Sequence, residues 1–219
     1  MLRDPDFRIL LNRSLAVLAI CVVAVVVCYF YIDRPVAYFV HRHERDGFRE
    51  FRSLTEPPPL VQIWSPLLVT LLIVRRAWGP WQRWQHVLFL ALISLIVADQ
   101  FRLSLGDLFG RYWPETWHDN NPSLIKNGAY RFHPFQADDD NGSFPSGHAA
   151  RILAFFTVFW LAAPRGRWLY AVVAAPMLVA LVVMNYHFVG DVIAGSALGG
   201  IIGAWAVRLS EIPKDFSTG

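Results

Sequence analysis

The chain has 219 residues, of which 55% are hydrophobic and 17% are charged, and its mean hydropathy is +0.36. This length suits one domain, and the apolar excess excludes an ordinary soluble enzyme. The net charge of +3 fits the basic loops of a membrane protein, and no basic run with interleaved aromatic residues indicates nucleic-acid binding. We therefore expect residues 1–219 to form a single integral membrane domain in contact with the bilayer.

Six apolar stretches are candidates for membrane-spanning helices, each of which needs ~20 residues, within roughly 17–25. The first follows several basic residues, as in a signal peptide, but it is long and lacks a small-residue cleavage site, which favours an uncleaved anchor. The second is short, begins after three prolines and contains Pro66, which favours a kink. The stretches lie at residues 15–32, 60–74, 85–105, 147–163, 168–184 and 188–207. The sequence therefore predicts an all-α fold, a bundle of six transmembrane helices.

An even number of spans places both termini on the same side of the membrane. Most basic residues of the termini and short loops then lie on that side, which the positive-inside rule makes cytoplasmic. They are Arg3, Arg8, Arg13, Arg75, Arg76, Arg83, Arg165, Arg167, Arg208 and Lys214. We expect a protein of the bacterial inner membrane, in which the loops after the first, third and fifth spans face the periplasm.

Two of the segments between the spans are expected on this outer side. Residues 33–56 predict an external amphipathic helix near the lipid headgroups. Its histidines and acidic residues lack the helical spacing of metal ligands, so no metal site is predicted there. Residues 110–146 predict a long external loop, and structureless loops of this length tend to be functional or disordered. The aromatic residues of the amphipathic segment are expected to face lipid: Tyr38, Phe39, Phe48 and Phe51.

The fourth span opens with the run Ser-Phe-Pro-Ser-Gly-His-Ala-Ala-Arg, which extends from Ser143 to Arg151. Pro145 bars the preceding residues from helical continuation, while Ser146 can cap the helix that follows and leave its first N–H groups facing the loop. Gly147 lets a ligand approach the backbone closely, and the helix dipole adds roughly half a positive charge at that end. Such caps are common, but this one has the chemistry of an oxyanion site, so Ser146 and Gly147 are expected to bind a phosphate.

The sixth span opens with His187 and Asp191, four residues apart and therefore on one helix face, where the carboxylate can hold the imidazole in one tautomer. Alone, such a pair is usually only a structural hydrogen bond. The predicted topology, however, places it on the same outer side as His148 at the start of the fourth span. We expect the two motifs to meet at one interface.

Pro-Ser-Gly-His, followed about forty residues later by His-x-x-x-Asp, resembles the second and third signature motifs of the type-2 phosphatidate phosphatases, also called lipid phosphate phosphatases. The resemblance covers roughly residues 60–208 and implies a catalytic core there, in the membrane branch of that superfamily. It implies that His187 attacks phosphorus, that Asp191 orients this histidine and stabilises the phosphohistidine, and that His148 protonates the leaving oxygen. The scheme needs no metal or other cofactor.

The cationic positions of the family are replaced in this sequence. The first family motif is Lys, six residues and Arg-Pro, and alignment on Pro114 puts Gly106 at the lysine and Trp113 at the arginine. The arginine that opens the third motif falls on Leu181. Because a phosphoryl-transfer transition state needs positive charge on its equatorial oxygens, other residues have to supply it.

Three arginines are the candidates for this charge. Arg111 lies two residues before the usual arginine, and Arg151 lies one turn after the histidine of the fourth span. Arg102, one turn before the lysine position, is the weaker candidate. If either of the first two proves to be structural, the compensating charge is expected from Arg102, Lys126 or Arg131.

Two further patterns concern packing inside the bilayer. Asp99 and Arg102 lie three residues apart in the third span, where charges are costly, so they are expected to pair with each other or to line a polar cavity. Gly195, Gly199 and Gly203 recur every four residues and let another helix approach closely. We interpret this stripe as packing within the bundle, with a homodimer contact as the alternative.

The sequence thus predicts hydrolysis of a phosphate monoester or diphosphate on a lipid at the outer membrane face. A phosphotransferase that passes a phosphoryl group or phospho-headgroup to a lipid or sugar alcohol is the alternative, since the same histidines would serve it. A binding protein that lost turnover is a third reading, against which the intact His148, His187 and Asp191 argue. The lipid itself is not specified by the sequence.

Overall fold

The computed structural model describes residues 5–43, 51–117, 120–135 and 142–210. Within these ranges the regular secondary structure is helical, apart from three isolated β-bridges in the loop between residues 111 and 142. The predicted all-α class is therefore confirmed for this part of the chain. Residues 44–50 of the predicted amphipathic segment, residues 118–119 and 136–141 of the loop, and also Arg3 and Lys214, lie outside the described residues.

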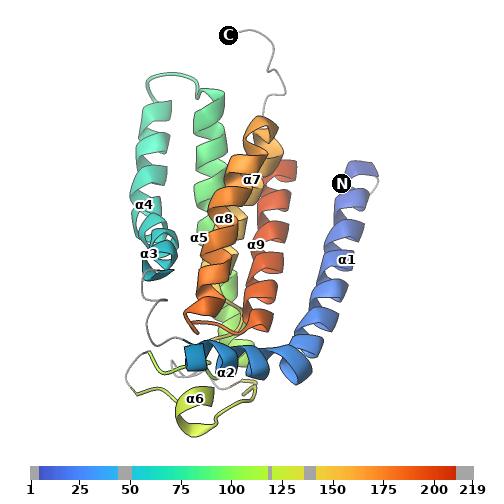
Figure 1. Ribbon diagram of the computed structural model, residues 1–219. Helices are drawn as coiled ribbons and strands as arrows, with labels where there is room; N and C mark the ends of the chain where they lie inside the picture. The colour runs from blue at the N-terminus through green and yellow to red at the C-terminus, as the bar shows by residue number, and fades with distance from the viewer. Residues whose placement is uncertain (1–4, 44–50, 118–119, 136–141, 211–219) are drawn as a thin grey trace.

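The helices form a bundle with one helix standing beside it (Figure 1). The bundle contains α4 (Pro57–Arg76), α5 (Arg83–Phe109), α7 (Gly147–Ala162), α8 (Arg167–Val183) and α9 (Val189–Leu209). The helix beside it is α1 (Pro5–Val27). Two short helices, α3 (Arg52–Thr55) and η4 (Pro164–Gly166), precede α4 and α8.

Five helical segments are long and apolar enough to cross a membrane, and α7 is a shorter apolar helix. Each of the six predicted apolar stretches therefore lies on a helix, although only five have spanning length within the described residues. The five segments are Pro5–His43, Arg52–Arg76, Arg83–Phe109, Pro164–Val183 and Val189–Leu209.

The second apolar stretch is longer in the structure than in the sequence pattern. Proline occupies the first turn of α4, where its fixed φ suits a helix start and its missing N–H costs nothing. Pro66 lies inside α4 without ending it, because the helix continues to Arg76. Together with α3 this segment has 25 residues. The pattern underestimated its length because the flanking polar residues and prolines are also helical.

A π-helical turn, η1 (Cys28–Ile32), joins α1 to α2 (Asp33–His43), and the chain changes direction there so that α2 lies across one end of the bundle (Figure 1). Helices commonly bend at such turns because an extra residue enters the hydrogen-bond ladder. One face of α2 is buried, with Asp33, Ala37 and Val40, while Phe39 is exposed. The two faces of α2 thus differ in burial, and the external position of the predicted amphipathic helix stays a prediction.

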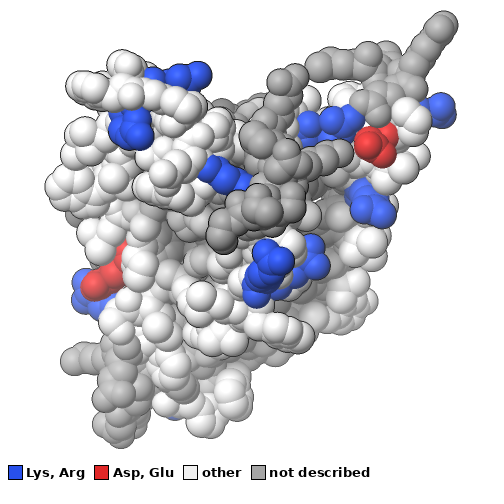
Figure 2. Space-filling model, turned by 90° about the horizontal axis from the view of Figure 1, so that it is seen from above, with Lys and Arg blue, Asp and Glu red and all other residues white. Residues whose placement is uncertain are grey.

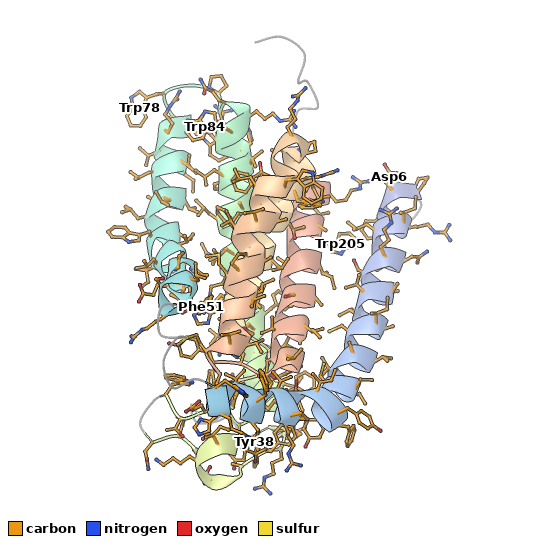
Figure 3. The ribbon with its side chains drawn as sticks, in the orientation of Figure 1. Asp6, Tyr38, Phe51, Trp78, Trp84 and Trp205 are labelled. Atoms are coloured by element: carbon orange, nitrogen blue, oxygen red, sulfur yellow. The ribbon has the colours of Figure 1, made fainter. Side chains whose placement is uncertain are left out.

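We call the end of the bundle that carries α2, α6 (Leu124–Asn127) and the described parts of residues 110–146 the loop end (Figure 1). Tyr38, predicted to face lipid, is instead half-buried there against the cluster of Ala37, Leu124 and Phe188 (Figure 3). This prediction needs correction because α2 lies directly on the loop, so that part of its apolar side contacts protein.

The opposite end carries the α4–α5 and α7–α8 connections, and we call it the basic end. Trp78 and Trp84 are exposed at this end (Figure 3). Figure 2, which looks onto it, shows Lys and Arg side chains around its rim. The basic residues on which the predicted orientation rests therefore lie opposite the loop end. They include Arg75, Arg76, Arg83, Arg165, Arg167 and Arg208.

The contact between α7 and α9 is made by small residues. A Cβ added at Gly195, Gly199 or Gly203 of α9 would collide with a backbone carbonyl oxygen of α7 or of the residue that caps it. The prediction that the glycine stripe packs within the bundle is thus confirmed. The carbonyl groups involved belong to Ser146, Ala150 and Ala154.

At the basic end, α1 and α9 are joined by a hydrogen bond from Trp205 Nε1 to Ser14 Oγ, at 3.0 Å. The ring of Trp205 also lies edge-on to Phe7, with 5.0 Å between centroids (Figure 3). The two cysteines of this helical segment, Cys21 and Cys28, are free. Near the basic end, Trp205 thus contacts two residues of α1.

Candidate active site

The two predicted motifs meet at the loop end. Ser146 caps α7 by accepting a hydrogen bond from Ala149 N at 3.3 Å, as predicted. The backbone N–H of Ser146 donates to Asp191 O at 3.0 Å, which ties the start of α7 to the start of α9. The first N–H groups of α7, at Gly147 and His148, have no partner inside the helix and are available to an anion.

His148 and His187 lie next to each other. Their ring centroids are 5.9 Å apart, with 61° between the ring planes. His148 is partly exposed, whereas His187 is only 3% exposed. The pair therefore combines a histidine that solvent can reach with one that is almost fully enclosed.

The hydrogen bond of His187 fixes its tautomer. Its Nδ1 lies 3.1 Å from Ser143 O, and because a carbonyl can only accept, Nδ1 must carry the proton and Nε2 the lone pair. Burial lowers the pKa of His187 well below 6.5, and the charges of His148 and Arg102 lower it further, against the opposing effect of the Ser143 hydrogen bond. His187 is therefore neutral at pH 7, as a nitrogen nucleophile has to be.

Asp191 does not hydrogen-bond His187 directly, which corrects the predicted contact. The nearest atoms, His187 Nδ1 and Asp191 Oδ2, are 3.9 Å apart. Asp191 Oδ2 instead accepts from Ser143 Oγ at 2.5 Å and from Phe188 N at 3.0 Å. Since the same serine offers its carbonyl to the imidazole, Asp191 orients His187 through Ser143.

Arg111 is fully buried, with 0% of its surface exposed. Its Nη1 donates to Asp191 Oδ1 at 2.5 Å, and its Nη2 donates to Asp33 Oδ2 at 2.7 Å and to Tyr130 Oη at 3.2 Å. Burial lowers the pKa of Arg111, but the carboxylates of Asp191 and Asp33 raise it more, so the net shift is upward. The predicted role as a phosphate ligand does not fit this placement, because two carboxylates already occupy the guanidinium.

Aromatic rings enclose the rest of this guanidinium. The ring of Phe188 is nearest, with its centroid 4.3 Å from the guanidinium carbon. Three other rings have centroids at 4.9–5.5 Å. These rings belong to Tyr29, Tyr130 and Phe132. A cation enclosed in this way is held by ring faces as well as by carboxylates.

Arg102 and Arg151 converge on the start of α7. A Cβ added at Gly147 would lie 3.0 Å from Arg102 Nε and 3.1 Å from Arg151 Nη2, so both guanidinium groups border the same glycine. Arg102 Nη2 donates to Gly142 O at 2.8 Å, while its buried Nε has no hydrogen-bond partner among the described residues. These two arginines, unlike Arg111, present donors beside the two histidines.

Asp99 pairs with Arg151 rather than with Arg102, the partner expected from spacing. Arg151 Nε donates to Asp99 Oδ1 at 2.9 Å, and Gln62 Nε2 donates to Asp99 Oδ2 at 2.5 Å. Residue spacing on α5 could not reveal these contacts, because the partners of Asp99 come from two other helices, α4 and α7. Of the two arginines, Asp99 thus pairs with Arg151, and Arg102 has no paired carboxylate among the described residues, so the start of α7 retains a positive excess.

The other positions singled out in the sequence lie around this centre. The ring of Trp113, at the place of the family arginine, is 5.2 Å from the ring of His187. Lys126 donates to Asn120 on the loop, and Arg131 Nε donates to His133 Nε2 at 2.9 Å. Among the described residues, no group of three or more His, Cys, Asp or Glu side chains is placed to hold a metal ion.

Sequence reasoning missed Asp33 and Ser143. An acidic residue directly after the first apolar run was a usable signal for Asp33. Ser143 gave no signal, because its carbonyl and hydroxyl groups act through contacts with residues 44 and 48 positions away.

Curated relatives match part of this chain. A lipid A 1-phosphatase from Rhizobium johnstonii is 32% identical over 127 residues, covering 58% of this chain and 46% of the relative. A lipid A 1-phosphatase from Rhizobium etli is 37% identical over 91 residues, covering 42% of this chain and 36% of the relative. The matched segments span less than half the length of these two relatives.

The fold also matches a solved structure, the transmembrane PAP2-type phosphatidylglycerolphosphate phosphatase from Bacillus subtilis. The TM-score is 0.56 at 13% sequence identity, over 93% of this chain and 98% of the other. At this identity the likeness concerns the fold alone. The sequence profile of the PAP2 superfamily, the type-2 phosphatidate phosphatases, matches residues 84–212, which include the histidines and Asp191. The chain is therefore a member of the PAP2 superfamily.

Proposed function

We propose that this chain is a membrane lipid phosphatase that hydrolyses a phosphate monoester or diphosphate through a phosphohistidine on His187. The observation that carries the proposal is the hydrogen bond from His187 Nδ1 to Ser143 O, which leaves Nε2 unprotonated in a buried site beside His148. A neutral imidazole next to two arginines and a helix N-terminus has the components of phosphoryl transfer to nitrogen.

In the first step, the Nε2 lone pair of His187 bonds to phosphorus while the bond from phosphorus to the leaving oxygen breaks. His148, protonated beside the anionic phosphate, gives its proton to that oxygen, so the lipid product leaves neutral at the cleaved position. In the second step, a water oxygen bonds to phosphorus, the phosphorus–nitrogen bond breaks, and the water proton passes to His148. The products are the dephosphorylated lipid and inorganic phosphate, or a phosphate-containing fragment.

The transferring phosphoryl group is held at the start of α7. Arg102 and Arg151 border Gly147, and the first N–H groups of a helix capped by Ser146 face the same region. These groups are proposed to bind the non-bridging oxygens, where charge develops in the transition state. Arg111 is left out of this set because both of its terminal nitrogens donate to carboxylates.

The loop end is proposed to face the periplasm of a bacterial inner membrane. The basic residues gather at the opposite end, which is the side that positively charged loops prefer to keep in the cytoplasm (Figure 2). In this orientation α2 lies at the outer surface as an external amphipathic helix, the long loop covers the site from outside, and the phosphate is bound at headgroup depth.

The names of the relatives support a lipid substrate, since they describe a lipid A 1-phosphatase and a phosphatidylglycerolphosphate phosphatase. The test is phosphate release by the purified full-length chain in liposomes that contain lipid A, phosphatidylglycerolphosphate, phosphatidate or a polyprenyl diphosphate. We expect inorganic phosphate from at least one lipid, and an acid-labile, base-stable phosphoryl label on His187 when the reaction is stopped early.

A lipid or sugar alcohol is added to the same assay to separate hydrolysis from transfer. A labelled histidine with transfer to the alcohol and no inorganic phosphate would assign the chain as a phosphotransferase. The absence of both label and phosphate with every lipid, in protein that still binds vanadate, would refute the phosphohistidine mechanism.

A further inference from the structure

The N-terminal helices contribute a side chain to the active site although they lie outside the matched family region, residues 84–212. Only 6% of the apolar window of the helical segment Pro5–His43 is buried, so α1 packs weakly on the bundle. At the bend between α1 and α2, however, Asp33 is 1% exposed. A carboxylate is therefore buried at the point where this otherwise peripheral segment reaches the loop end.

Asp33 makes two hydrogen bonds to groups next to the catalytic residues. Its Oδ1 accepts from Gly190 N at 2.9 Å, in the first turn of α9. Its Oδ2 accepts from Arg111 Nη2 at 2.7 Å. A Cβ at Gly190 would lie 3.1 Å from Asp33 Oδ2, so the glycine is what permits the close approach. Asp33 thus contacts both the residue preceding Asp191 and the arginine that binds it.

Arg111 links Asp33 to Asp191. One terminal nitrogen of the planar guanidinium donates to each carboxylate, so the position of Asp33 determines how the other nitrogen meets Asp191. Without Asp33, the Nη2 of Arg111 would have one remaining hydrogen-bond partner among the described residues, Tyr130 Oη at 3.2 Å. The backbone of Arg111 also accepts from Ser143 N at 3.1 Å.

From these contacts we infer that Asp33 is a positioning residue of the active site, acting through Arg111 and Asp191 on Ser143 and so on the tautomer of His187. This inference rests on the proposed function for its catalytic consequence, but the tautomer itself is a property of the resting protein. The α1–α2 segment is then an integral part of the phosphatase site and not only a membrane anchor.

The test compares Asp33→Asn with Ser14→Ala in the full-length protein. Ser14→Ala is the matched control, because it removes the hydrogen bond between α1 and α9 at the basic end and leaves the site intact. We expect Asp33→Asn to lower kcat about 10- to 100-fold with KM within about twofold, the size found for residues that orient a catalytic group indirectly. Ser14→Ala should leave both constants within about twofold of the original protein.

A double variant tests whether Asp33 acts through Arg111. Once Arg111→Gln has cut the link, adding Asp33→Asn should cause no further loss of kcat, because the losses are non-additive for residues in one network. Gly190→Ala serves as a milder variant. The added methyl group would crowd Asp33 Oδ2 and leave every charge in place, so Gly190→Ala should also lower kcat. The inference would be overturned if the fold-loss of kcat in the double variant equalled the product of the two single losses. It would also be overturned if Ser14→Ala and Asp33→Asn lowered kcat equally.

A spectroscopic readout separates this inference from the proposed function. In protein labelled with 15N-histidine, the ring nitrogen shifts report the tautomer, and His187→Asn identifies the His187 signals. We expect the Nδ1–H tautomer in the original protein and in Ser14→Ala, and a mixed or lost tautomer signal in Asp33→Asn. An unchanged tautomer in Asp33→Asn refutes the inference, whereas a changed tautomer in a protein that hydrolyses no lipid phosphate refutes the proposed function alone.

Discussion

Two groups of buried charges at the loop end use the same residue type for different purposes. In the first, Arg111 is enclosed between Asp33 and Asp191, and its side chain is 0% exposed. In the second, Arg151 shares Asp99 with Gln62, and its side chain is 12% exposed. We call the first the closed cluster, and the second, together with Arg102, the open cluster.

The difference lies in how many acceptors each arginine already has. The closed cluster has two carboxylates for one guanidinium. It therefore carries excess negative charge, which disfavours binding of a phosphate. The open cluster has one carboxylate for two guanidinium groups. The buried Nε atoms of Arg102 and Arg111 both lack a hydrogen-bond partner within the described residues, so the clusters differ in their carboxylates and not in these atoms. An arginine with few paired carboxylates can bind an oxyanion, whereas one held between two carboxylates positions these partners.

The largest effect is expected where the two clusters meet, at His187. His187→Ala removes the nucleophile and should lower phosphate release by more than about 10³-fold, while the folded protein remains. The measurement is the rate of phosphate release in liposomes, with His86→Ala on α5 as the matched histidine control. Retained turnover in His187→Ala would assign the chemistry to another residue.

The closed cluster is expected to respond in stability as well as in kcat. Arg111→Gln leaves two carboxylates buried without their cation, which should destabilise the fold by about 3–5 kcal/mol. The measurement is the temperature of unfolding in detergent. An Arg111→Gln protein that is as stable as the original but binds vanadate poorly would contradict the comparison, because Arg111 would then be acting as a phosphate ligand.

The open cluster is expected to respond mainly in activity. Arg102→Lys and Arg151→Lys preserve charge but lose the planar fork, and each should lower kcat/KM about 10-fold or more and weaken vanadate binding. The unfolding temperature should change little. Lys126→Ala, an exposed loop residue, is the control and should leave kcat/KM within about twofold. A loss in the control as large as in the arginine variants would move the anion site onto the loop.

The smallest effect expected is on pH dependence. Because burial lowers the pKa of His187, this histidine stays neutral at pH values just below 6.5, so kcat/KM should not fall there once the substrate's own ionisation is corrected for. The pKa shift of His187 also affects the free energy of unfolding, because the unfolded chain binds the proton more readily than the folded one. The stability contributed by neutral His187 is fully present above pH 6.5 and is lost as the pH falls towards the lowered pKa. If kcat/KM fell below pH 6.5 because His187 becomes protonated, the buried, neutral state of this histidine would be contradicted.

The helices and the two motifs could be predicted because their signals are local. Apolar runs located the six apolar helices of the described residues, and the Ser146 cap and the spacing from His187 to Asp191 are short-range patterns. The role of Arg111 could not be predicted in this way. Its function depends on Asp33, which lies 78 residues away, and on Asp191, which lies 80 residues away. Whether an arginine has free donors depends on such distant partners, and the sequence gives no spacing rule for them.

The glycine stripe of α9 has a consequence for the distance between the catalytic histidines. Gly195, Gly199 and Gly203 bring the backbones of α7 and α9 into contact, and each helix carries one motif at its loop end. A larger side chain at Gly199, deep in the bundle, would meet the backbone of Ala150 and force the helices apart. Inactivating substitutions are therefore expected at these glycines inside the bundle, where no polar group is altered, because the close approach of α7 and α9 sets the distance between His148 and His187.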